Sequence, residues 1–130
     1  MAVSTLTKSR TELEMELSRA FIRFEKEHMG RGPLETKTYL LDDLVLVRLK
    51  GVLTPAERKL AQSKSHRSGY LLKQVRNELL SSGRPVLEAM LYDIVGVPVQ
   101  SIHTDISTKT GERVIVITLA EPLEFHGKTA

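Results

Sequence analysis

Two pairs of short strand-like runs, each pair joined by a polar turn, constrain the fold of this chain more than any other feature. The first pair covers residues 36–41 and 44–49 with two aspartates between them, and the second covers 99–106 and 113–119 with a polar stretch between them. β-Branched and aliphatic residues are frequent in all four runs, as is typical of strands, and short polar turns connect strands into hairpins. The sequence therefore predicts two β-hairpins.

Helical patterns precede and separate these hairpins. Ser9 and Glu12 form a capping-box pattern before apolar residues spaced three and four apart, and Thr54 and Glu57 repeat that pattern around Pro55. These patterns predict one helix at the N-terminus and a second helix that starts at residue 55.

The central region is expected to contain two interruptions. The polar stretch 64–69 predicts a loop after the helix that starts at residue 55, and Pro85 is expected to kink or split the helix that follows. Proline has this effect because it cannot donate a backbone hydrogen bond and its ring displaces the preceding turn.

The order helix, hairpin, helices, hairpin favours the α+β class. We expect the two β-hairpins to form a mostly antiparallel four-stranded sheet, with an N-terminal helix and a central helical region packed on it. A chain of 130 residues has the size of one domain, so the expected organisation is a single domain over 1–130 with a flexible tail at 121–130.

Composition excludes several classes of protein. The chain has no cysteine, which rules out disulfides, cysteine-ligated zinc, iron–sulfur clusters and thiol catalysis. No apolar run reaches the roughly 18 to 20 residues that span a bilayer, and the N-terminus lacks the apolar stretch of a signal peptide. We therefore expect a cytoplasmic protein.

Basic residues gather in the middle of the chain. Between Arg48 and Arg76 the sequence has eight Lys and Arg against Glu57 alone, a local charge of +7 in a chain whose net charge is +3. A solvated helix face is the simpler explanation, and a docking surface for an acidic partner or for anionic lipid headgroups is the functional one. Three Tyr and three Phe leave little for base stacking, which makes nucleic acid a poor candidate partner.

Three ordered motifs resemble the MpsC family. They are the glycine-rich stretch 30–33 (GRGP), the stretch 42–57 (DDLVLVRLKGVLTPAE) and the stretch 103–113 (HTDISTKTGER). The resemblance implies a small bacterial or cyanobacterial accessory component of a sodium-translocating, membrane-potential-generating system that is linked to inorganic-carbon supply. It implies no catalytic residue and no cofactor.

The resemblance also implies a partner, which is a subunit of a membrane ion or inorganic-carbon uptake complex. Attachment to the inner face of the membrane is compatible with that expectation. A nucleic-acid-binding or small-anion-sensing module that uses the same basic segment is the alternative. We also expect a homo-oligomer, because a small four-stranded sheet exposes two edges that proteins usually cover, charge or pair.

Cations in the basic segment and the flanking motifs are the candidate residues for binding a partner or an anion. Backbone amides and a guanidinium at 30–33 could hold a phosphate, carboxylate or bicarbonate, although ending the preceding helix is the simpler role of this loop. The full set of candidates is Arg31, Arg48, Lys50, Arg58, Lys59, Lys64, Arg67, Lys109 and Arg113.

His103 and Asp105 are weaker candidates. They lie two apart in a predicted strand, so they share one polar face, where Glu112 or Arg113 could join them. Such a face could exchange a proton or bind a metal, but so few ligands favour an ordinary exposed strand. Because the sequence also lacks a nucleophile motif of the G-x-S-x-G type, we expect no metal and no enzymatic activity.

Overall fold

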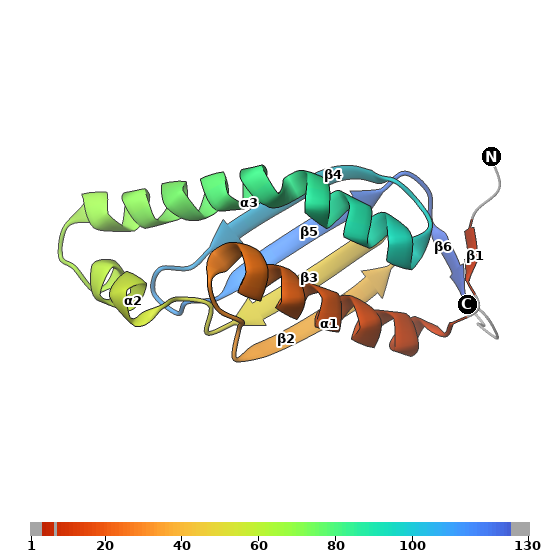
Figure 1. The fold of residues 1–130 in the computed structure, drawn as a ribbon, viewed down its shortest axis with the longest axis horizontal. Coiled ribbons are helices and arrows are strands. Elements are labelled where there is room, and N and C mark those ends of the chain that lie inside the picture. Colours follow the sequence, from red (N-terminus) through yellow and green to blue (C-terminus); the bar gives the residue numbers. More distant parts are fainter. Residues whose placement is uncertain (1–3, 7, 126–130) are drawn as a thin grey trace.

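The protein is a four-stranded antiparallel sheet with two long helices on one face (Figure 1). The computed structural model describes residues 4–6 and 8–125. The strand order is β2-β3-β5-β4, and the strands are β2 (Glu35–Leu41), β3 (Leu44–Lys50), β4 (Val99–Ile106) and β5 (Arg113–Leu119). The two predicted hairpins therefore lie side by side, and the predicted α+β class is confirmed.

Helix α1 (Arg10–Met29) forms as its caps predict. Ser9 and Glu12 make both hydrogen bonds of the capping box, and Gly30 ends the helix in the left-handed conformation with φ 89°. The buried residues Leu17 and Phe21 belong to the stripe that faces the sheet. This helix packs on β2 and on the long helix α3 (His66–Val95), so both long helices and the sheet share one core.

The central helical region differs from the prediction. Helix α2 (Pro55–Ala61) is short, and α3 already begins at His66, with Ser65 as its N-cap, so the predicted loop over 64–69 is too long. Helix α3 also continues through Pro85 to Val95, and Figure 1 shows it bending near its middle without a break. The predicted split is therefore wrong.

Packing explains why α3 stays continuous. Leu72, Leu87 and Leu91 on either side of Pro85 are buried in the same core, whereas Pro85 itself faces solvent. Burial of several leucines contributes more free energy than the roughly 3 kcal/mol that a proline costs inside a helix. The tertiary core therefore overrides the local preference for a break.

Each face of the sheet has a different environment. Alternate residues of β3 and β5, such as Val45, Val47, Ile115 and Ile117, are buried against the helices. Residues on the opposite face remain partly or fully exposed, and within residues 4–6 and 8–125 no helix covers that face (Figure 1).

A second, parallel pair of short strands joins the two ends of the described chain. Strand β1 (Ser4–Leu6) pairs with β6 (Leu123–Phe125) in register. The flexible tail was expected to begin at residue 121, but Leu123 is only 7% exposed and belongs to the core, so ordered structure extends to residue 125. Residues 126–130 of the expected tail lie outside the described residues.

None of the helices in the described part of the chain is long and apolar enough to cross a membrane.

Candidate functional site

The three sequence motifs meet at one end of the sheet. The Nη1 atom of Arg31, from the loop that follows α1, donates a hydrogen bond to the carbonyl of Leu53 at 3.1 Å. The backbone N–H of Val52 donates to the carbonyl of Gly111, at the tip of the β4–β5 hairpin, at 3.3 Å. Segments that are far apart in the sequence are therefore connected at this end by hydrogen bonds to backbone carbonyls.

A pocket of about 340 Å³ lies where these segments and α2 meet. Gly51 and Gly111 in its wall have φ angles of 67° and 76°, in the left-handed region, and a Cβ atom on Gly51 would lie 2.6 Å from side-chain atoms of Leu34. The backbone conformation therefore favours glycine at position 51, and any other residue would also have to displace the exposed side chain of Leu34. The lining residues are Leu34, Gly51, Leu53, Arg58, Ala61, Gln62, Thr108, Lys109, Thr110 and Gly111.

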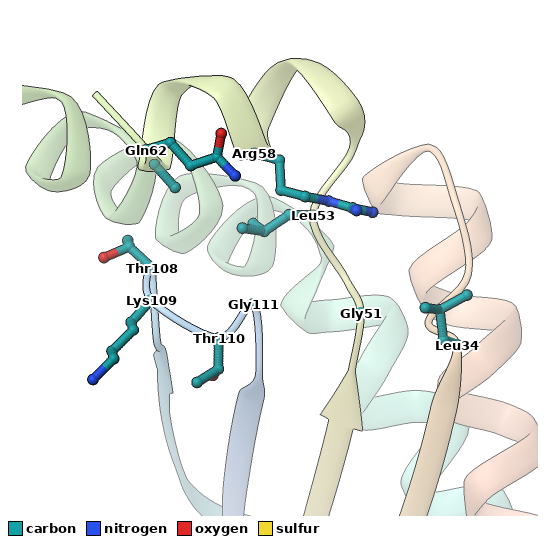
Figure 2. Close-up of a pocket in the computed structure, with 10 residues that line it drawn as sticks. Leu34, Gly51, Leu53, Arg58, Gln62, Thr108, Lys109, Thr110 and Gly111 are labelled. Atoms are coloured by element: carbon teal, nitrogen blue, oxygen red, sulfur yellow. The ribbon is translucent and has the colours of Figure 1, made fainter. Parts of the chain in front are cut away.

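The polar groups around this pocket converge only in part. Figure 2 shows Arg58 extending from α2 across Leu53, with Gln62 close to it, while Lys109 on the hairpin points away from Arg58. The pocket thus offers one guanidinium, an amide and threonine hydroxyls above an apolar wall. This arrangement can hold a small polar or anionic group but contains no acid–base pair.

Two arginines and two glutamates form a charge cluster that is buried except for the partly exposed Glu57. The Nε atom of Arg76 donates to Glu57 Oε2 at 2.9 Å, and its Nη2 atom donates to the Val52 carbonyl at 2.8 Å. Glu25 on α1 is fully buried, and its Oε1 atom lies 3.8 Å from Arg76 Nη1, an ion-pair distance too long for a hydrogen bond. Arg113 completes the cluster.

Burial and charge act in opposite directions on the pKa values of this cluster. Burial raises the pKa of Glu25, although the charges of Arg113 and Arg76 oppose the rise. The pKa of Glu57 lies below its ordinary value. Burial alone would raise this pKa, but the hydrogen bonds from Arg76 and Thr54 outweigh the effect of burial. Burial lowers the pKa of Arg113. Glu25 is therefore the carboxylate whose charge is least compensated.

Arg113 is not a surface residue as the sequence suggested. Its side chain is 1% exposed and donates to the hydroxyl of Thr104 at 3.2 Å and to the carbonyl of Arg76 at 3.5 Å. It cannot meet a partner there, because position 113 lies on the helix-facing side of β5. Arg76, which contributed to the local charge of +7, is also internal, because it lies on the buried face of α3.

Other candidate residues are separated in space. Arg48 lies on the open face of the sheet and pairs with Glu112, which raises the pKa of Arg48. Lys50 is half-buried at the end of β3, Arg31 holds the Leu53 carbonyl, and Lys109 is exposed on the hairpin. The basic segment is therefore not one continuous surface.

His103 and Asp105 do share the open face of β4, as predicted. Asp105 Oδ1 accepts a hydrogen bond from the Ile106 N–H at 2.8 Å and lies 3.3 Å from Lys73 Nζ. The Ile106 bond is the main reason why the pKa of Asp105 is low, and Lys73 adds to it. Among the residues that the structure describes, no three His, Asp or Glu side chains gather in a way that could hold a metal ion.

Four cations remain together on the surface, and we call them the basic tip. They are Arg58, Lys59, Lys64 and Arg67, all exposed, and in the described part of the chain none of them forms an ion pair. Figure 1 shows that α2 and the first turns of α3, which carry them, extend beyond the end of the sheet. The remaining part of the predicted basic surface is this protrusion.

The fold and the site define a small two-layer α+β domain whose accessible polar groups are suited to binding. Comparison with known proteins gives its family: residues 9–121 match the family described as Na+-translocating membrane potential-generating system (MpsC), and the chain belongs to that family. The predicted membership is thus confirmed. The description ties the family to a system that moves sodium and generates a membrane potential.

A relative of similar length occurs in Bacillus subtilis (strain 168). It carries the name "Uncharacterized protein YbcI" and is 43% identical over 120 residues, which cover 92% of this chain and 94% of the relative. Neither that name nor the family description indicates a catalytic activity. No solved structure gave a significant match.

Proposed function

We propose that this protein is a non-enzymatic accessory or regulatory protein of a membrane cation-translocating or inorganic-carbon uptake system, and that it docks through the basic tip. The observation that carries this proposal is the position of the tip, four exposed cations on a protrusion beyond the sheet. Membership of the family named for a sodium-translocating system supports the choice of partner.

The composition of the protrusion favours an acidic partner. The chain has no Asp or Glu from residue 58 to residue 77, so nothing in this stretch neutralises the four cations. Complementary charges raise the rate of encounter and fix the orientation of docked partners. Leu60 and Tyr70 are exposed beside the cations and supply apolar area for contact. An acidic surface at the inner face of the membrane fits this chemistry.

Recovery of the partner from native membranes tests the proposal. The tagged protein is purified from gently solubilised cells, and the co-purified subunits are identified by mass spectrometry. Reversal of the four cations to glutamate, in the variant Arg58→Glu, Lys59→Glu, Lys64→Glu and Arg67→Glu, should abolish recovery of an ion-transport or carbon-uptake subunit. Unchanged recovery with this variant would refute docking through the tip.

A matched control separates position from total charge. Four exposed cations on α1 provide the same change in net charge away from the tip, in the variant Arg10→Glu, Arg19→Glu, Arg23→Glu and Lys26→Glu. We expect this control to retain the partner. Circular dichroism of both variants shows whether the fold is intact.

Binding of a small anion is a second candidate function, supported by the pocket that Arg58 and Gln62 face. Calorimetric titration with bicarbonate and with inorganic phosphate tests it, using Arg58→Gln as the variant that removes the guanidinium. The nucleic-acid version of this alternative predicts binding that weakens steeply with salt. If neither bicarbonate nor phosphate gives a heat of binding, anion binding in this pocket is contradicted.

A further inference from the structure

Apolar side chains lie on the open face of the sheet, from the edge strand β2 across β3 to β5. Tyr39 and Leu41 on β2 are 38% and 51% exposed, and Leu46 on β3 and Val116 on β5 are partly exposed beside them. An antiparallel sheet with one solvated face normally carries polar residues there. Aliphatic side chains on both faces of β3 and β5 indicate that something covers this face.

A row of charged residues crosses the same face, next to these apolar side chains. Lys37 on β2 is in register with Arg48 on β3, Arg48 with Val114 on β5, and Val114 with Asp105 on β4. The row therefore has cations toward the β2 edge and a carboxylate at the β4 edge. Adjacent to it, the row of Tyr39, Leu46, Val116 and His103 is largely apolar.

We propose that this face is the interface of a homodimer in which the second copy packs face to face, related by a two-fold axis that runs along the strands. Such an axis reverses the order of the strands but leaves each row opposite the same row. Lys37 then lies opposite the partner's Asp105, and the symmetric contact repeats on the other edge. Packed sheets lie about 10 Å apart, a gap that a lysine and an aspartate can bridge.

The charges and the apolar side chains favour this axis over the other two-fold axis that lies parallel to the sheet. An axis across the strands would lay β2 over β2 and β4 over β4, so that Lys37 would lie over the partner's β2, far from the partner's Asp105. The axis along the strands instead brings opposite charges together and sets the apolar rows against each other. Docking by the basic tip uses different residues, so dimerisation does not depend on it.

Analytical ultracentrifugation of the full chain over a wide range of concentrations tests the interface. The wild type should form a dimer, and Lys37→Asp or Asp105→Lys alone should raise the dissociation constant about tenfold or more, because each places like charges opposite each other twice. Arg19→Asp, at an exposed position of α1, is the control that should leave the dimer unchanged.

The double variant Lys37→Asp with Asp105→Lys gives the decisive result. Positions 37 and 105 lie on opposite edges of the sheet, so the swapped charges cannot pair within one chain. Restored association relative to Asp105→Lys, which shares the same change beside Lys73, supports the proposed axis. A wild type that stays monomeric, single variants that still dimerise as well as the wild type, or a double variant without recovery would each overturn it.

Discussion

Replacement of Arg76 by methionine should remove a large part of the stability of this domain. The substitution keeps the volume approximately but leaves Glu25, which is fully buried, without its nearest positive charge, and it leaves the Val52 carbonyl without its donor. Loss of one partner from a buried ion pair costs about 3 to 5 kcal/mol, and an unpaired buried carbonyl adds about 1 to 3. Glu57 adds less, because it is partly exposed and can regain water.

Urea unfolding followed by circular dichroism measures this loss. We expect the free energy of unfolding to fall by about 4 kcal/mol or more, out of the roughly 5 to 15 that a domain possesses. Arg67→Met on the exposed first turn of α3 is the control, with an expected change within about 0.5 kcal/mol. The double variant of Arg76→Met and Glu25→Gln should recover part of the loss. A loss below about 1 kcal/mol for Arg76→Met would refute the reasoning.

Three further predictions concern the core and the helices. Gly83→Ala should lower the free energy of unfolding by about 1 to 3 kcal/mol in urea melts, because the new Cβ would lie 2.9 Å from the ring of Phe24. Pro85→Ala should raise the melting temperature, because an exposed proline inside α3 is replaced by the best helix former, a gain of up to about 3 kcal/mol. Because the folded-state pKa of Glu25 is raised above its ordinary value of 4.5, its contribution to stability is present below that pH and is lost as the pH rises through the raised pKa. As the pH rises from 4.5, the urea concentration at the midpoint of unfolding should therefore fall less for Glu25→Gln than for the wild type.

The strands were predictable almost to the residue. The first hairpin was expected over 36–41 and 44–49, and the strands span Glu35–Leu41 and Leu44–Lys50. The second hairpin was expected over 99–106 and 113–119, which are the observed bounds of β4 and β5. Strand composition and turn residues are local signals, so a single sequence contains them.

Continuity of α3 was not predictable from local rules. Its start has a local signal, the N-cap Ser65, whereas its passage through Pro85 follows from leucines that reach a core built by distant segments. The cost of a proline is a property of the local chain, whereas the compensating burial depends on β3, β5 and α1, whose positions the local sequence does not contain.

The sequence contains a pattern that indicates the burial of Arg76 and Glu25, but a count of charges does not show it. Arg76 lies four residues after Leu72 and four before Leu80, both of which are buried, and Glu25 follows Phe21 by four. Each charged residue thus occupies the position of a core residue in an apolar helical stripe. A sum of charges along the chain cannot show this, because the sum ignores which face of the helix each residue occupies.

The buried cluster and the basic tip are connected through the carboxylate of Glu57. Its Oε1 atom accepts the Thr54 N–H at 2.9 Å and so caps α2, while its Oε2 atom accepts the Arg76 bond at 2.9 Å. No residue of α2 is fully buried and only Ala61 packs against the core, so polar contacts contribute much of what holds this helix in place. Elements with few buried contacts open at a low cost in free energy. We therefore predict that Arg76→Met loosens the helix that presents Arg58 and weakens the proposed docking even in molecules that remain folded.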